Sequence, residues 1–220
     1  MDIELVDKIS FGLMWGTAFI FSATAHEAAH AFVAHKGGDD TAYAGGQVTL
    51  NPIPHIVREP VGMVVVPLVL YALFGYMFGW ASAPINPYWA DRYPRRAAWM
   101  AAAGPAANLL IALLAVVFGR VLFGLSLLSM DADLANTVFQ FVSIFVELNL
   151  MLFVFNLIPV SPLDGARAIV LIFPERIADR VLEKTHALGF MGIFLAWMIM
   201  GRIFGLVNLN ELSYRLIVGN

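Results

Sequence analysis

Long apolar runs alternate with shorter polar connections along this chain, and each run is close to the length that crosses a membrane. An apolar stretch of about 20 residues spans the hydrocarbon core as an α-helix. Helix is the expected form because lipid offers backbone groups no other partner. Four runs fit this pattern, and they cover residues 9–33, 97–125, 138–158 and 187–209. The pattern therefore predicts an all-α polytopic membrane protein with about four full transmembrane helices.

A fifth apolar run, Val61–Trp80, differs from the others because it carries Pro67 in its middle. Proline removes a backbone donor and kinks or breaks a helix. Residues 81–94 are rich in proline, which favours extended chain and turns. Residues 36–60 are rich in Gly, Pro and Asn, and Gly46–Leu50 alternates in a way that indicates a short strand. A short β-hairpin-like loop is therefore expected after the first helix.

The composition excludes several classes of protein. Of 220 residues, 60% are hydrophobic and 13% are charged, against about 25% charged in an ordinary soluble domain. The mean hydropathy is +0.78. A net charge of −3 offers no basic surface for nucleic acid, and the absence of Cys excludes disulfides, Cys-bound zinc and a thiol nucleophile. A soluble globule, a disordered chain and a nucleic-acid binder are thus excluded, and residues 1–220 are expected to form a single integral-membrane domain.

The first apolar run contains His26-Glu27-Ala28-Ala29-His30, which matches H-E-x-x-H. Residues four apart on a helix lie on one face, so both imidazoles can bind one Zn²⁺. Glu27 then lies beside the attacking water, whose pKa zinc lowers toward about 7. A carboxylate there can take the proton and later pass it to the leaving amine. A chance match is the alternative, but ionisable groups inside an apolar helix are costly and favour a functional role.

A catalytic zinc usually has three protein ligands and leaves one position for water. The remaining histidines are poor candidates, since His35 lies past the first run, His55 lies in a Pro-rich loop and His186 lies at the edge of a run. Asp164 is better placed, because it follows the run 138–158 in a segment that prolines keep from forming a regular helix. The spacing alone leaves two alternatives open for Asp164, a metal ligand or the N-cap of the next helix.

Three motifs, in order, resemble those of the site-2 protease family of intramembrane zinc metalloproteases. That family pairs H-E-x-x-H with a later N-x-x-P-x-x-P-x-D-G element, which residues 156–165 match at every fixed position. Ala103–Asn108 matches A-G-P-x-x-N, and Lys36–Asn51 resembles the loop after the metal helix in compact bacterial members. The likeness covers about residues 22–172, and neither a PDZ-like nor a nucleotide-binding module is recognised.

The resemblance implies a reaction and a set of partners. Glu27 is implied as general base and then general acid, and one zinc ion per chain is implied with His26, His30 and Asp164 as ligands. The substrates implied are transmembrane proteins, cut in or near their membrane-spanning segments, as in regulated intramembrane proteolysis. The lipid bilayer is the other partner, with neither nucleic acid nor a nucleotide.

Asn156 and Asn108 are candidates for supporting roles. By the resemblance, Asn156 holds substrate or positions the segment that carries Asp164. Its alternative is a hydrogen bond to a neighbouring helix, as polar residues in membrane bundles often make. Asn108 has a similar alternative, because Gly104-Pro105 beside it indicates a small-residue contact between helices.

A transmembrane substrate must unwind before it is cut, because its helical carbonyls are already hydrogen-bonded and sterically covered. Gly46 and Asn51 belong to the loop that resembles the family's loop, and both are candidates for contact with substrate. The Gly46–Leu50 piece is expected to pair with the extended substrate as an added strand.

A shared metal constrains the path of the chain. His30 lies at the end of its run and Asp164 lies just beyond the end of its own. One metal can bind both only if these ends share a membrane side, so the chain between them must cross the membrane an even number of times. Counting Val61–Trp80 as a full span gives three crossings. Val61–Pro94 is therefore expected to be re-entrant, with irregular backbone shielded by protein.

The basic residues orient this arrangement in the membrane. Because cytoplasmic loops carry an excess of Lys and Arg, the active site of this multi-pass protein is expected to face the cytoplasmic side of the cell membrane. Five simple spans would divide the same charges eight to three, so the metal and not the charge count decides the topology. Two basic residues, Lys8 and Arg215, fall on the far side, and nine fall on the metal side: Lys36, Arg58, Arg92, Arg95, Arg96, Arg167, Arg176, Arg180 and Lys184.

The sequence therefore favours an intramembrane zinc metalloendopeptidase. A zinc-binding membrane transporter or sensor is the first alternative, but it needs ligands and no base, so Glu27 counts against it. An inactive protease-like scaffold is the second alternative, and the complete set of catalytic residues counts against it.

Overall fold

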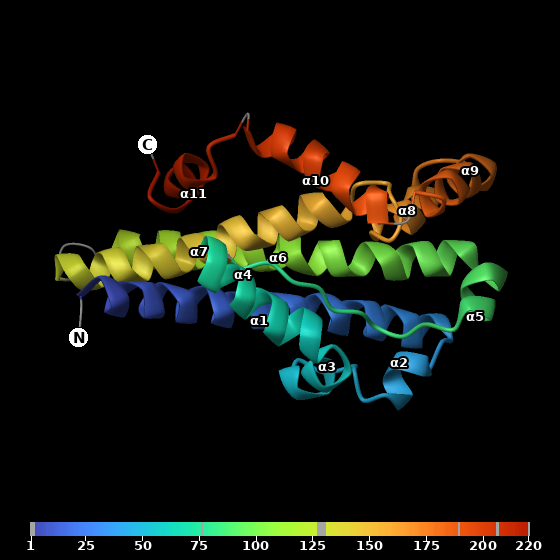
Figure 1. Ribbon diagram of the computed structural model, residues 1–220, viewed down its shortest axis with the longest axis horizontal. Helices are drawn as coiled ribbons and strands as arrows, with labels where there is room; N and C mark the ends of the chain where they lie inside the picture. Colours follow the sequence, from blue (N-terminus) through green and yellow to red (C-terminus); the bar gives the residue numbers. More distant parts are fainter. Residues whose placement is uncertain (1–2, 76, 127–130, 189, 206, 220) are drawn as a thin grey trace.

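Three long helices form the centre of the molecule and run side by side along its longest axis (Figure 1). They are α1 (Ile3–Gly37), α6 (Pro94–Ser126) and α7 (Ala132–Asn156). This computed structural model describes all residues except 1–2, 76, 127–130, 189, 206 and 220. α1 and α7 run in the same direction, toward the end of the trio where α6 begins, and the shorter α7 stops before that end.

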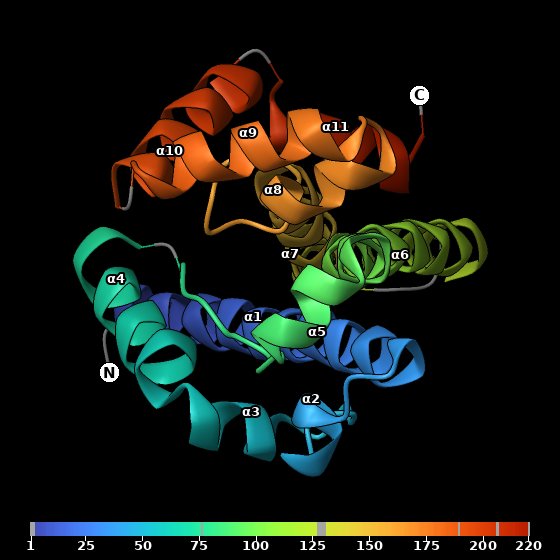
Figure 2. The ribbon, with the colours of Figure 1, turned by 90° about the vertical axis from the view of Figure 1, so that its right-hand side faces the viewer.

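Shorter helices lie on two sides of this trio when the molecule is viewed end-on (Figure 2). On one side are α2 (Thr41–Ala44), α3 (Pro52–Arg58) and α4 (Val66–Phe74). On the other side are α9 (Glu175–His186), α10 (Phe190–Gly205) and α11 (Leu209–Ile217). The chain reaches α9 through α8 (Gly165–Ala168) and a 3₁₀ turn, Ile169–Leu171.

Two helices in the described part of the chain are long and apolar enough to cross a membrane, α6 over residues 94–125 and α7 over residues 132–156. A third candidate is the pair formed by α3 and the helical residues 61–74, which are bent by 108° against each other. The predicted all-α architecture is confirmed, whereas the prediction of four full transmembrane helices is not.

The difference arises at α1 and α10. α1 has 35 residues and is about 50 Å long, but a group of polar residues lowers its hydropathy. These residues are buried against the rest of the protein, and they are Ser22, Thr24, His26, Glu27 and His30. α10 has 16 residues and is about 24 Å long, which is less than the roughly 30 Å of hydrocarbon that a span must cross.

Small residues let α1 and α6 approach closely. Small side chains allow helix backbones to come together in membrane bundles. The close approach brings the first half of α6 against the polar turns of α1, where His26 and His30 bond to it. The alanines in this contact are each at most 2% exposed, and they are Ala31, Ala34, Ala97, Ala98 and Ala101.

The chain between α3 and α6 reverses direction halfway. A π-helical turn, Val61–Val65, leads into α4, and Gly75 ends α4 in the left-handed conformation with φ of +77°. The chain then runs back in extended form, and Trp80 N donates a hydrogen bond to Gly62 O. This course, in which the chain enters and returns, agrees with the path that the shared metal requires. Its depth in a membrane stays a prediction.

Asp39, just after the end of α1, links this end of the helix to the returning segment through hydrogen bonds. Its carboxylate accepts hydrogen bonds from Thr41 N at 3.0 Å, Thr41 Oγ1 at 2.5 Å and Asn86 N at 2.8 Å. Although burial raises the pKa of Asp39, these hydrogen bonds hold that pKa below its ordinary value. The extended chain thus ends at α5 (Pro87–Arg92), at the end of the molecule that holds α8 and α9 (Figure 1).

The predicted strand Gly46–Leu50 is absent. No strand occurs in the described residues, and residues 46–50 form a turn and bends. A single short strand leaves its backbone groups without partners, and here Gln47 N donates to Ala42 O in the preceding helix. Gly46 has φ of +69°, which belongs to a turn. The expected β-hairpin-like loop is therefore corrected to two short helices, α2 and α3, joined by turns.

Candidate metal centre

His26, Glu27 and His30 lie on the last third of α1, and their side chains are buried with 5–7% exposure. Because the helix brings residues four apart onto one face, the two imidazole rings lie edge to face with centroids 4.5 Å apart. Buried ionisable groups in an apolar helix need partners. The contacts of these three residues therefore define the site.

Each imidazole donates its Nδ1 proton to a fixed acceptor on α6. His26 Nδ1 donates to Asn108 Oδ1 at 2.5 Å, and His30 Nδ1 donates to the Met100 carbonyl oxygen at 2.7 Å. A histidine that binds a metal through one nitrogen commonly donates from the other, which fixes its tautomer. Both Nε2 atoms thus keep a free lone pair, and they lie 2.9 Å apart.

Asn108 is held in turn by a buried chain of hydrogen bonds. Its Nδ2 donates to Asn149 Oδ1 at 2.9 Å, and Asn149 Nδ2 donates to Ser22 Oγ at 2.8 Å. All three side chains are fully buried. Because Asn108 Nδ2 is already used as a donor, its Oδ1 is left to accept from His26. The chain links α1, α6 and α7 at the level of His26 and orients that imidazole.

Asp164 meets the two histidines from the segment that follows α7. Its Oδ2 lies 3.1 Å from His26 Nε2, and its Oδ1 lies 3.3 Å from His30 Nε2. Asp164 directly precedes α8, yet its side chain makes no capping hydrogen bond. Although burial raises the pKa of Asp164, the two imidazoles hold that pKa below its ordinary value. Of the two alternatives left open by the sequence, this geometry favours the ligand over the cap.

These three side chains form a donor set that fits a zinc ion. Their ligand atoms all lie within 4.8 Å of one another. Tetrahedral zinc with bonds of about 2.0–2.1 Å separates its ligand atoms by roughly 3.3 Å. Here the two Nε2 atoms lie 2.9 Å apart, and each has a different oxygen of Asp164 at 3.1 or 3.3 Å. Two imidazole lone pairs and a carboxylate that converge in this way repel one another unless a positive charge lies among them.

Gly104 on α6 lets this helix pack directly against the two imidazoles. A Cβ built at Gly104 would lie 2.4 Å from His30 Nε2 and 2.5 Å from His26 Nε2. Both distances are far below a van der Waals contact, so a methyl group at residue 104 cannot fit beside the two imidazoles.

We expect Gly104→Ala to abolish zinc binding, because its methyl group would clash with both imidazoles and displace them. The matched control is Gly124→Ala in the same helix, where an added Cβ meets nothing within 4 Å. Zinc per chain, measured on the purified variants by plasma mass spectrometry, is the readout. Full zinc occupancy in Gly104→Ala would show that the metal binds away from the two Nε2 atoms.

Glu27 and His30 line a cavity of about 320 Å³ beside this centre. Asp164 and extended-chain residues 81–83 and 85 also line it. No hydrogen bond joins the Glu27 carboxylate to the described part of the chain. This carboxylate is therefore available to a water molecule or a substrate in the cavity.

Three other predicted site residues lie outside this cavity. Asn156 Nδ2 donates to Leu152 O in its own helix at 3.0 Å. Asn51 caps α3, where its side chain accepts from Ile53 N at 3.0 Å, and Gly46 lies in the turn after α2. The fold thus uses Asn156 and Asn51 for local hydrogen bonds, and it brings only Asn108, among the four supporting candidates, to the metal centre.

The histidines that sequence analysis set aside have other partners. His35 Nδ1 lies 2.6 Å from Asp40 Oδ1, and the ring stacks on Tyr43. His55 Nε2 donates to Thr49 O at 3.0 Å. The side chain of His186 lies outside the described part of the chain. His35 and His55 are therefore accounted for without a metal.

Three residues contribute to the centre in ways that the sequence does not reveal. Met100 acts through its backbone carbonyl, and Gly104 acts through the absence of a side chain, so neither carries a chemical signature. Asn149 did carry a signal, because an amide inside an apolar run is costly to bury without partners. That signal marks Asn149 as a bonded residue but does not identify Asn108 and Ser22 as its partners.

Comparisons relate the chain to known proteins. Residues 125–201, which include Asp164, match the family described as Peptidase family M50. The chain is 38% identical over 181 residues to "Putative zinc metalloprotease YwhC" of Bacillus subtilis (strain 168), which covers 82% of this chain and 77% of that protein. It is 29% identical over 204 residues to "Putative zinc metalloprotease Rip2" of Mycobacterium tuberculosis (strain ATCC 25618 / H37Rv), with 90% and 74% covered. No solved structure matches the chain.

Proposed function

Because the chain belongs to peptidase family M50, the family of the site-2 proteases, we propose that it is an intramembrane zinc metalloendopeptidase. It hydrolyses peptide bonds in or near the transmembrane segments of membrane proteins. The observation that carries this proposal is the convergence of His26, His30 and Asp164 beside the buried Glu27. Residues 1–220 act as one membrane domain, with the catalytic motifs between about residues 22 and 172.

One zinc ion per chain is held by His26 Nε2, His30 Nε2 and the Asp164 carboxylate. When bound, zinc lowers the pKa of the attacking water and polarises the scissile carbonyl. Asn108 and the Met100 carbonyl keep the two Nε2 lone pairs directed inward, because they hold the Nδ1 protons. These two contacts position the ligands and take no part in the chemistry.

Glu27 moves the proton. Its carboxylate follows His26 directly on α1 and lines the cavity next to the metal centre. It takes a proton from the attacking water and then gives it to the nitrogen of the leaving peptide. At 6% exposure, the carboxylate acts in a site from which bulk water is largely excluded.

The substrate reaches this cavity as unwound, extended chain. Residues 81–83 and 85, in the segment that returns from α4, line the cavity beside Glu27. Extended backbone can pair with an extended peptide as an added strand. We therefore assign to this segment the strand pairing that was expected of Gly46–Leu50. Leu50 does not line the catalytic cavity but a separate apolar groove beside α1.

The alternatives differ in what they do with zinc. A transporter or sensor binds zinc and cuts nothing, and an inactive scaffold cuts nothing either. Co-expression with single-span proteins separates the protease from both alternatives, with Glu27→Gln as the comparison. Cleavage that requires Glu27 supports the protease, whereas identical fragments from both forms would point to another enzyme.

The metal centre faces the cytoplasmic side of the cell membrane, and the segment 61–94 re-enters on that side. Because the chain has no Cys, single cysteines can be placed at the exposed positions Lys36, Arg92, Asp131 and Arg180. We expect a membrane-impermeant thiol reagent, added outside intact cells, to label only the cysteine at position 131. In inverted vesicles the other three positions become reactive. Labelling at position 92 from outside, with 36 and 180 protected, would disprove the re-entrant path.

A further inference from the structure

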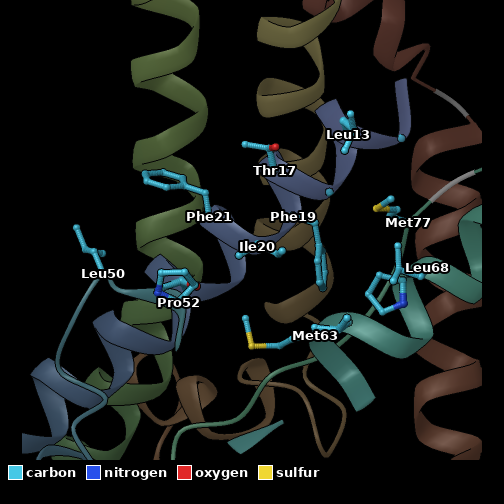
Figure 3. A pocket seen from close by; sticks show the side chains of 15 residues that line it. Leu13, Thr17, Phe19, Ile20, Phe21, Leu50, Pro52, Met63, Leu68 and Met77 are labelled. Carbon is cyan, nitrogen blue, oxygen red and sulfur yellow. The ribbon is translucent and has the colours of Figure 1, made fainter. Parts of the chain in front are cut away.

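A long apolar groove lies along α1 on the side of α4. Its volume is about 510 Å³, and its lining comes from α1, the loop around Leu50, the helical residues 63–68 and Met77. Figure 3 shows Phe19 of α1 beside Met63 and Leu68 of the facing segment. On α1 the lining extends from Gly12 to Thr24, which is about 18 Å along the helix. The groove is therefore shaped for an elongated apolar molecule.

The groove leads toward the catalytic cavity. On α1, Thr24 lines the groove, and Glu27, three residues later, lines the cavity. In the returning segment, Met77 lines the groove and Ala81 lines the cavity. Both α1 and the returning segment thus extend from the groove to the catalytic cavity. The inner end of the groove therefore lies within about one helical turn of Glu27.

Thr24 supplies a polar group at the inner end of the groove. The residue is 2% exposed, and its Oγ1 is buried without a hydrogen-bond partner in the described part of the chain. A buried hydroxyl without a partner is costly, and such a group in a ligand site calls for a polar atom of the ligand. The groove therefore suits a molecule that is mainly apolar but carries a hydrogen-bonding group near the catalytic end.

We propose that this groove docks the transmembrane segment of the substrate, and that Thr24 Oγ1 bonds a backbone group of the substrate where its helix unwinds. The inference rests on the proposed protease function. Apolar side chains of the segment fill the groove. When the helix opens ahead of cleavage, its freed N–H and C=O groups need new partners in apolar surroundings. A threonine hydroxyl can donate to such a carbonyl or accept from such an N–H.

A lipid acyl chain is the other apolar molecule that a membrane offers. The hydrocarbon of an acyl chain has no group that can form a hydrogen bond with Thr24 Oγ1. The unpaired hydroxyl therefore favours a peptide over a lipid as the occupant.

Cross-linking tests the groove directly. In the inactive Glu27→Gln form, which has no native Cys, single cysteines are placed at Leu13 and Leu68 on the two sides of the groove. The probe is a single-span test protein with a Leu- and Ala-rich span that carries one Cys and a central Asn-Gly pair to ease unwinding. We expect disulfides to the probe from both positions, and only background from Leu114→Cys, an exposed position on α6.

The outcomes separate this inference from the protease proposal. Cross-links from Ala83→Cys in the catalytic cavity, with none from Leu13→Cys or Leu68→Cys, would leave the protease intact and overturn the groove. Capture of a phospholipid with a photoactivatable acyl chain at both positions, undiminished by the probe, would assign the groove to lipid. Failure of the wild-type chain to cleave any test protein would remove the protease proposal and the groove with it.

Substitution at Thr24 tests the hydroxyl. Thr24→Val keeps the shape of the side chain, and we expect it to lower kcat/KM on the cleaved test protein about 2- to 10-fold, with zinc content unchanged. Thr24→Ser restores the hydroxyl and is expected to be close to wild type. The matched control is Thr137→Val, whose hydroxyl bonds Asp133 O within α7. Wild-type rates in Thr24→Val, or an equal loss in Thr24→Ser, would overturn the role of the hydroxyl.

Discussion

Glu27→Gln is expected to lower proteolysis at least about 100-fold while zinc stays near one per chain, because positioned general bases contribute about 10²–10⁴-fold. Gln has the size and shape of Glu but cannot take a proton from the attacking water. The two histidines and Asp164 are unchanged, so the donor set for the metal remains complete. The measurement is the cleavage rate of a single-span test protein, together with zinc content per chain.

The matched control for this variant is Glu147→Gln. Glu147 also lies in a long helix, but its carboxylate accepts a hydrogen bond from Ser213 Oγ on α11, away from the metal centre. We expect this control to cleave at close to the wild-type rate. Retained cleavage in Glu27→Gln would remove the proposed mechanism, and loss of zinc would make Glu27 a structural part of the metal site.

Asp164→Ala is expected to lower both zinc affinity and proteolysis by more than about 100-fold. A catalytic zinc usually has three protein ligands, and this change leaves two imidazoles. Loss of groups that merely orient ligands costs about 10–100-fold in metal affinity, so loss of a ligand itself should cost more. Zinc affinity is measured by competition with a chelating dye, and proteolysis by the test-protein assay.

Asp179→Ala serves as the matched control, because Asp179 is exposed on α9 at the same end of the molecule. It is expected to bind zinc as the wild type does. Unchanged zinc affinity in Asp164→Ala would mean that another group completes the site and that Asp164 has a structural role at the start of α8.

The catalytic motif could be predicted from the sequence because its spacing is local. The helical period alone places His26 and His30 on one face with Glu27 between them in sequence. The spacing could not decide whether Asp164 is a metal ligand or an N-cap, because Asp is a common N-cap residue directly before a helix. Asp164 was assigned as a ligand because of the resemblance to site-2 proteases. Membership of family M50 confirms that resemblance, and the missing capping bond agrees with the assignment.

The supporting contacts could not be predicted because they depend on the tertiary arrangement of helices. Asn108 and Asn149 are 41 residues apart, and a general helix contact was an equally simple explanation for Asn108. Gly104 looked like a small residue at a helix contact, whereas in the fold it keeps a Cβ away from two imidazoles. Asn156 matched a motif position, yet its side chain bonds the carbonyl four residues earlier in its own helix.

The elements were predicted best where the apolar pattern is continuous. The runs 97–125 and 138–158 correspond to α6 and α7, which begin a few residues earlier. The pattern failed at Gly46–Leu50, because five alternating residues cannot show whether a second strand is available for pairing. It also overestimated the last run, where α10 ends at Gly205 and a separate helix, α11, begins at Leu209.

Cleavage by the purified chain in liposomes is the most direct test of the central claim. Wild-type protein with one zinc per chain is reconstituted with a single-span test protein, and the products are identified by mass spectrometry. The expected result is two fragments, cut in or near the span, whose masses sum to the substrate plus one water. A zinc chelator stops the reaction, added zinc restores it, and Glu27→Gln gives no fragments. Full zinc occupancy with no cleavage of a panel of such proteins would contradict the account and favour a zinc transporter or sensor.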